Sequence, residues 1–181
     1  RGENQRVMVA KISGSRELDL DILITHPRFT DRSVAQTLEA NVEAIADLIS
    51  AHTTTLVFAN TRKMTETLVQ RLRPFLGELV AGHHGSMDKN IRLEVERKLK
   101  LGHLRAVVTS SSLEMGIDIG SVDLVVQVGS PGDIATALQR IGRAGHHVGG
   151  IPRARLLPSS VDDLLELAAL QAAIQTGDMD R

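Results

Sequence analysis

Short apolar runs alternate along this chain with longer segments in which apolar residues recur every three or four positions. The short runs are rich in Val and Leu, which predicts buried strands over residues 55–59, 79–81, 105–109, 124–128 and 155–157. Residues 17–24 alternate apolar and polar positions, as a half-exposed strand does, and a turn joins them to a predicted strand over residues 6–12. Strands separated by helices in this way predict an α/β fold with a parallel sheet covered on both faces.

The longer segments have the periodicity of amphipathic helices. The first helix is capped by Ser33 or Asp31, and its predicted apolar stripe consists of Val34, Leu38, Val42, Ile45 and Ile49. The second helix begins at Thr61 and is expected to end at Pro74, because proline lacks the N–H group that a continuing helix needs. Three more helices are predicted over residues 88–101, from Asp133 onward, and over residues 161–176.

Polar loops of small residues follow four of the predicted strands. The carboxyl ends of parallel strands meet at one edge of a sheet, which is where ligands of such folds bind. The hydroxyl, amide and free backbone N–H groups of these loops suit a phosphate: residues 60–62, 82–86, 109–112 and 129–133. Helix capping alone explains any one of the loops, but the four together predict a functional edge.

Residues 139–146 place a glutamine, two arginines and two glycines inside a segment of helical length. On a helix, Gln139 and Arg143 lie four positions apart and share one face. A guanidinium presented there can grip a phosphate with its fork of donors. A solvated amphipathic helix with two surface arginines is the alternative interpretation.

The amino-acid composition excludes or disfavours several classes of function. The chain has 181 residues, is 42% hydrophobic and carries a net charge of −1, so nucleic-acid binding would need a local patch and would weaken readily in salt. With no Trp or Tyr and three Phe, base stacking on an aromatic platform is disfavoured. The absence of Cys excludes thiolate chemistry and fits a cytoplasmic protein, and no apolar run is long enough for a membrane span.

Several signatures of self-sufficient catalysis are missing. No Gly-x-x-x-x-Gly-Lys-Ser/Thr loop occurs, and no strand leads into an Asp-Glu pair that could hold Mg²⁺, so the chain alone is not expected to hydrolyse ATP. His83 and His84 have no further ligand at metal-binding spacing, and we predict no metal site. Asp118 lies between Gly116 and Gly120, where it could bind a ribose hydroxyl or cap local amides.

Four segments together resemble the second RecA-like domain of superfamily 2 helicases, in a form similar to the large helicase-related (Lhr) family. Residues 56–62 resemble motif IV, residues 83–86 the conserved loop that follows it, residues 110–123 motif V and residues 139–146 motif VI. The resemblance extends over residues 55–157. It implies entry strands from a preceding domain over residues 1–30, the RecA-like domain over 31–158, and a helix over 159–181 that leads to a winged-helix domain.

The resemblance also implies an ATP-dependent helicase in which ATP and Mg²⁺ bind between this domain and a preceding RecA-like domain that supplies the phosphate loop. Arg143 would be the arginine finger, and the implied nucleotide-binding residues are Gly116, Asp118, Gln139, Arg140 and Arg143. Contacts with a single strand of nucleic acid, DNA rather than RNA, would come from Asn60, Thr61, Arg62, His84, Gly85, Ser86, Thr109, Ser110 and Ser111.

This sequence departs from the superfamily pattern at two positions. His146 stands where motif VI usually ends in a second arginine, which would make the catalytic demand on Arg143 heavier. Ser110 takes the place of the usual motif V threonine, and Thr109 lies one position earlier. Three other functions are open at this point: a small-molecule enzyme, an interaction module that docks through residues 164–174, and a remodelling motor that does not unwind.

Overall fold

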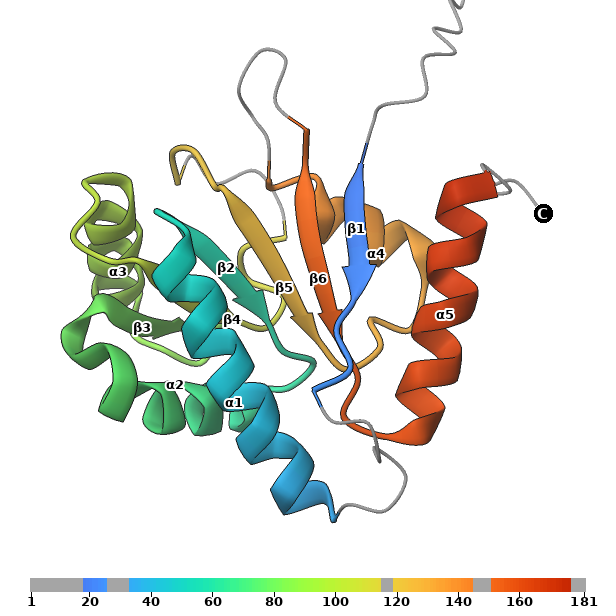
Figure 1. Ribbon diagram of the computed structural model, residues 1–181. Coiled ribbons are helices and arrows are strands. Elements are labelled where there is room, and N and C mark those ends of the chain that lie inside the picture. The colour runs from blue at the N-terminus through green and yellow to red at the C-terminus, as the bar shows by residue number, and fades with distance from the viewer. Residues whose placement is uncertain (1–17, 26–32, 115–118, 145–150, 177–181) are drawn as a thin grey trace, which may run out of the picture.

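The computed structural model describes residues 18–25, 33–114, 119–144 and 151–176, which form a six-stranded parallel sheet with helices on both faces (Figure 1). In chain order the elements are β1 (Asp19–Ile22), α1 (Val34–Ala51), β2 (Thr55–Phe58), α2 (Arg62–Leu76), a 3₁₀ turn (Gly77–Leu79), β3 (Val80–His83), α3 (Lys89–Lys100), β4 (Ala106–Thr109), β5 (Leu124–Val128), α4 (Ile134–Ile141), β6 (Arg153–Leu157) and α5 (Val161–Thr176). The strand order is β1-β6-β5-β2-β4-β3. The predicted α/β class and its parallel sheet are confirmed, while the strand predicted over residues 6–12 lies outside the described residues.

The central strands are buried on both sides. Val57 and Phe58 are neighbours in β2 and therefore point to opposite faces, yet both are fully buried. Val57 packs with residues of α1 and α2, including Ile49 and Leu68, whereas Phe58 packs with residues of α3, α4 and α5. Full burial of an aliphatic or aromatic side chain contributes about 1.5–3 kcal/mol, so the two layers stabilise the sheet from which the loops emerge.

Two helices differ in detail from the predictions, α1 in its buried stripe and α2 in its end. Ser33 caps α1 through a capping box with Gln36, but Val34 is 76% exposed and does not belong to the buried stripe. Pro74 lies inside α2, which continues to Leu76. In the last turn of the helix, proline removes the backbone hydrogen bond of one N–H group. Burial of Leu76 offsets that loss, and Gly77, at φ 57°, then ends the helix.

The helix α4 is shorter than the sequence pattern indicated. It begins after Asp133, whose carboxylate accepts from the Thr136 amide, and it ends at Ile141 with Gly142 as its C-cap. Glycine costs about 1 kcal/mol relative to alanine inside a helix, which favours termination there. Arg143 therefore lies in the turn beyond α4, and the prediction that it shares a helix face with Gln139 is wrong.

The strand β3 extends two residues beyond its predicted end at Ala81, because His83 continues the ladder opposite Thr109 of β4. Among the described residues, none of the helices is both long and apolar enough to cross a bilayer.

Candidate functional site

The register of the sheet brings the predicted loops to one edge. Phe58 of β2 lies opposite Thr109 of β4 on one side and Gln127 of β5 on the other, and His83 lies opposite Thr109. The loops after these four strands consequently emerge next to one another at one edge of the sheet.

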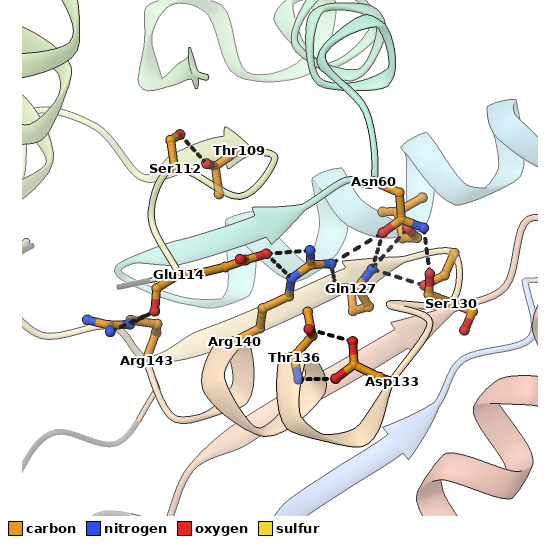
Figure 2. A network of polar contacts seen from close by, with 12 residues as sticks. Asn60, Thr109, Ser112, Glu114, Gln127, Ser130, Asp133, Thr136, Arg140 and Arg143 are labelled. Atoms are coloured by element: carbon orange, nitrogen blue, oxygen red, sulfur yellow. Dashed lines mark hydrogen bonds and ion pairs between the residues drawn. The ribbon is translucent and has the colours of Figure 1, made fainter. Parts of the chain in front are cut away.

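One polar cluster at this edge is organised by Arg140 of α4, which is only 7% exposed (Figure 2). Its Nε donates to Glu114 Oε1 at 2.7 Å, and its Nη2 donates to the same carboxylate. Its Nη1 donates to Gln127 Oε1 at 2.8 Å and to Asn60 Oδ1 at 3.3 Å. We call these four residues the Arg140 cluster. The guanidinium also lies 5.2 Å from the centre of the Phe58 ring, a cation–π distance, so burial of its charge is compensated from several directions.

Asn60 extends this cluster to the loop after β5. Its Nδ2 donates to the Ser130 carbonyl at 2.6 Å, and a side chain at Gly129 would begin 3.2 Å from that same nitrogen. Asp163 of α5 holds the loop from the other side, accepting from the amides of Ser130 and Ser159, each at 3.0 Å. Asp163 thus joins the loops after β5 and β6.

Arg143 is held differently from Arg140. Its Nε and Nη2 donate to the backbone carbonyl of Glu114 at 3.1 and 2.7 Å, and the residue is half-buried. Within the described part of the chain, no contact is seen from its third nitrogen, Nη1. Gln139, the neighbour implied for nucleotide binding, is exposed on α4. Arg143 is therefore oriented but accessible, whereas Arg140 is enclosed by its own chain.

A second cluster lies across the same edge and consists of His83, Glu96, Thr109 and Ser112; we call it the His83 cluster. The His83 ring is fully buried, with Nδ1 2.7 Å from Ser112 Oγ and Nε2 2.8 Å from Glu96 Oε1. Ser112 Oγ also lies 3.1 Å from Thr109 Oγ1. Burial lowers the pKa of His83, and the nearby Glu96 only partly opposes that shift. Ser112 Oγ also donates to the backbone carbonyl of His83 at 3.1 Å, so the side chain and the backbone of His83 contact the same hydroxyl.

The residues predicted to contact nucleic acid divide into an exposed and a buried group. Exposed at the edge are Asn60, Thr61, Arg62, Gly85, Ser86 and Ser111; buried are His84, Thr109 and Ser110. Thr61 caps α2 by accepting from the Met64 amide at 3.1 Å, and Arg62 hydrogen-bonds to Ser86 across the gap between α2 and the loop after β3.

The remaining predicted residues are a buried histidine and three residues that the structure does not describe. The Nε2 atom of His84 lies 3.2 Å from Glu66 Oε1. Gly116, Asp118 and His146 lie outside the described residues. Within the described ranges, no three side chains of metal-binding type converge.

Sequence reasoning assigned no role to Glu114, Gln127 or Asp163. Gln127 offered a signal, since it is the one polar residue in the strand Leu124–Val128 and a polar side chain inside an all-buried strand requires a partner. Glu114 offered no comparable signal, because acidic residues are ordinary in loops.

Comparison with known proteins identifies the family and similar structures. The family model of the helicase conserved C-terminal domain matches residues 40–148. An ATP-dependent helicase Lhr-Core protein 2 from Thermococcus barophilus is 43% identical over 91% of this chain, which spans 19% of that relative. The structure of the Mycobacterium smegmatis helicase Lhr bound to ssDNA and AMP-PNP superposes with a TM-score of 0.84 and 42% identity, over 91% of this chain and 22% of that one.

A more distant structure shares the fold alone. The C-terminal domain of the DEAD-box protein Dbp5 superposes with a TM-score of 0.66 at 21% identity, over 92% of this chain and 88% of that domain. This chain spans about a fifth of the length of its Lhr relatives. With the RecA-like sheet, the two arginines of residues 139–146 and these matches, the chain belongs to the helicase conserved C-terminal domain family, and it is similar to the Lhr helicases.

Proposed function

We propose that this chain forms the second half of an ATP-dependent motor that moves along single-stranded DNA. In this proposal ATP binds in a cleft shared with a preceding RecA-like domain, and Arg143 reaches the nucleotide as the arginine finger. The observation that carries the proposal is the contrast at residues 139–146: Arg140 is buried among four acceptor contacts, whereas Arg143 is half-exposed and held by one carbonyl. Relatives named ATP-dependent helicases support it, as does the relative bound to ssDNA and AMP-PNP.

The residues present fit one side of an ATP site. Arg143 and the exposed Gln139 offer donors and positive charge but no carboxylate pair for Mg²⁺, in keeping with a metal and phosphate loop supplied by the preceding domain. When bound there, ATP with Mg²⁺ would supply a phosphoryl group for transfer to water. Arg143 would stabilise the negative charge that develops on that group, and electrostatic stabilisation of this kind is usually the largest single term in catalysis. Gly116 and Asp118 remain predicted contacts on the ribose side.

The exposed residues of the edge are proposed to follow the sugar–phosphate backbone of the DNA. Thr61, Ser86 and Ser111 contribute hydroxyl donors, and Arg62 contributes a charge close to Ser86. Contacts of this kind position a strand without reading its bases, which suits a motor that must pass every sequence. The buried residues Thr109 and Ser110 can support these contacts through their backbone.

The decisive experiment replaces Arg143 by alanine in the full-length protein and measures ssDNA-stimulated ATPase activity. Loss of an arginine finger is expected to reduce kcat by about 10³–10⁵-fold while ATP binding is largely retained. Arg71→Ala is the matched control, because Arg71 is an exposed arginine on α2 that pairs with Glu39. Near-normal turnover by the Arg143→Ala protein would remove the finger assignment. Strand separation on tailed duplexes, measured in parallel, distinguishes a helicase from a translocase that does not unwind.

A further inference from the structure

Glu114 contacts both arginines of residues 139–146, and it does so with two different groups. Its carboxylate accepts from Nε and Nη2 of Arg140, and its backbone carbonyl accepts from Nε and Nη2 of Arg143. Figure 2 shows Glu114 between the two guanidinium groups, with its side chain directed toward Arg140 and its backbone toward Arg143. A single residue in the loop after β4 therefore links the buried arginine of α4 to the accessible arginine in the turn beyond α4.

The Arg140 side of this link is rigid. Arg140 and Glu114 side chains are 8% and 16% exposed, and the same guanidinium is also fixed by Gln127 and Asn60. Those two partners belong to β5 and to the loop after β2, so the carboxylate of Glu114 is tied to the centre of the sheet. A charged, two-donor contact of this type has a defined direction as well as a defined distance.

The Arg143 side of the link is the part that reaches outward. Two nitrogens of one guanidinium share one carbonyl oxygen, which fixes the plane of the group. That carbonyl and the carboxylate held by Arg140 belong to the same residue, Glu114, whose side chain is only 16% exposed. Arg143 is thus oriented by the carbonyl of a residue whose carboxylate is bound to Arg140.

We propose that Glu114 is a positioning residue for the arginine finger, an inference that rests on the function proposed above. Its side chain anchors the loop on Arg140, and its carbonyl holds the guanidinium of Arg143 ready to meet the phosphate. The position of a catalytic group strongly affects the reaction rate, since a displacement of about 1 Å can reduce turnover about 10²-fold.

The test measures ssDNA-stimulated ATPase activity in the full-length protein carrying Glu114→Gln, Arg143→Ala, or both. Glu114→Gln keeps the shape of the side chain and removes its charge. We expect kcat to fall by about 10–100-fold, with KM for ATP and binding of a non-hydrolysable ATP analogue unchanged. The double variant should be no slower than Arg143→Ala alone, because residues that act as a unit are not additive. Glu39→Gln is the matched control, since it removes an exposed glutamate that also pairs with an arginine.

The outcomes separate this inference from the proposed function. If Arg143→Ala abolishes turnover but Glu114→Gln leaves kcat unchanged, or if the two losses multiply in the double variant, Glu114 does not position the finger. If Arg143→Ala turns over normally, the finger assignment fails and the positioning role fails with it. Should Glu114→Gln not fold, as judged by circular dichroism, Glu114→Asp keeps the charge, shortens the reach and is expected to lower kcat in the same direction by a smaller factor.

Discussion

The Arg140 cluster and the His83 cluster both hold residues 109–114, but one depends on charge and the other on a neutral ring. At one end of the segment, Glu114 meets a permanently charged guanidinium that is almost fully enclosed. At the other end, Ser112 and Thr109 meet an imidazole whose pKa is lowered by burial. The same segment is therefore fixed by an ion pair toward the proposed nucleotide side and by neutral hydrogen bonds toward the proposed DNA side.

This difference between an ion pair and neutral hydrogen bonds predicts how each cluster responds to mutation and to acid. A buried ion pair is worth little relative to an apolar replacement of both partners, but removing one partner leaves an uncompensated charge and is expensive. A neutral hydrogen bond contributes less, and its loss costs mainly the desolvation of the group left behind. The Arg140 cluster should thus be the more sensitive to mutation, and the His83 cluster the more sensitive to acid.

The largest effect on stability is expected from Arg140→Ala. Removing the guanidinium leaves the Glu114 carboxylate without its partner and vacates the contact with the Phe58 ring, so the free energy of unfolding should fall by about 3–5 kcal/mol. Urea denaturation of the 181-residue chain measures this loss. Arg71→Ala, which breaks the exposed pair with Glu39, should cost less than about 1 kcal/mol. Equal losses in the two variants would show that the Arg140 cluster is no stronger than a surface ion pair.

A smaller effect is expected from His83→Gln, which removes a fully buried ring and its contacts with the partly exposed Ser112 and Glu96. Leaving buried polar groups without partners costs about 1–3 kcal/mol, measured by the same denaturation at pH 8. His103→Gln, in the exposed turn after α3, is the matched control and should have little effect.

The His83 cluster should also give the chain an acid-sensitive stability. The folded-state pKa of His83 lies below the unfolded value of about 6.5, so the unfolded chain binds the extra proton. The contribution of His83 is fully present above pH 6.5 and is lost as the pH falls from 6.5 toward the lowered folded-state pKa. Unfolding measured from pH 8 to pH 5 should show this decline in the wild type and a smaller one in His83→Gln. An identical decline in both proteins would mean that His83 is not its source.

Local rules predicted most of the fold. The apolar runs of β2, β4 and β5, the cap at Ser33 and the helix starts near Thr61 and Asp133 all depend on signals within a few residues of one another, and each is confirmed. The errors arose where a competing local effect decided the outcome. Gly142 ended α4 earlier than the polar pattern indicated, and burial of Leu76 carried α2 past Pro74.

The site was less predictable because its contacts join distant parts of the chain. The sequence of residues 139–146 marks two arginines, but nothing within it distinguishes Arg140 from Arg143. Their difference comes from Glu114, 26 positions before Arg140 in the sequence, and from Asn60, 80 positions before it. Only the packing of α4 against β2 and β5 determines which arginine is enclosed, and that packing is a property of the whole sheet.

The smallest expected effect concerns Arg62, an exposed residue at the edge that neither cluster includes. Because the net charge of the chain is −1, binding to a DNA backbone has to rely on individual local cations. In Arg62→Ala the affinity of the full-length protein for ssDNA should fall uniformly across sequences. The negative slope of the logarithm of the association constant against the logarithm of the salt concentration should become shallower by about 1. Fluorescence anisotropy over a salt series measures both. Ser86→Ala removes the hydroxyl partner of Arg62 but no charge, so it should leave the slope unchanged. A slope unaltered by Arg62→Ala would place the DNA elsewhere on the domain. A shallower slope with unchanged thermal stability would show that the exposed edge binds DNA, whereas the two clusters support the fold.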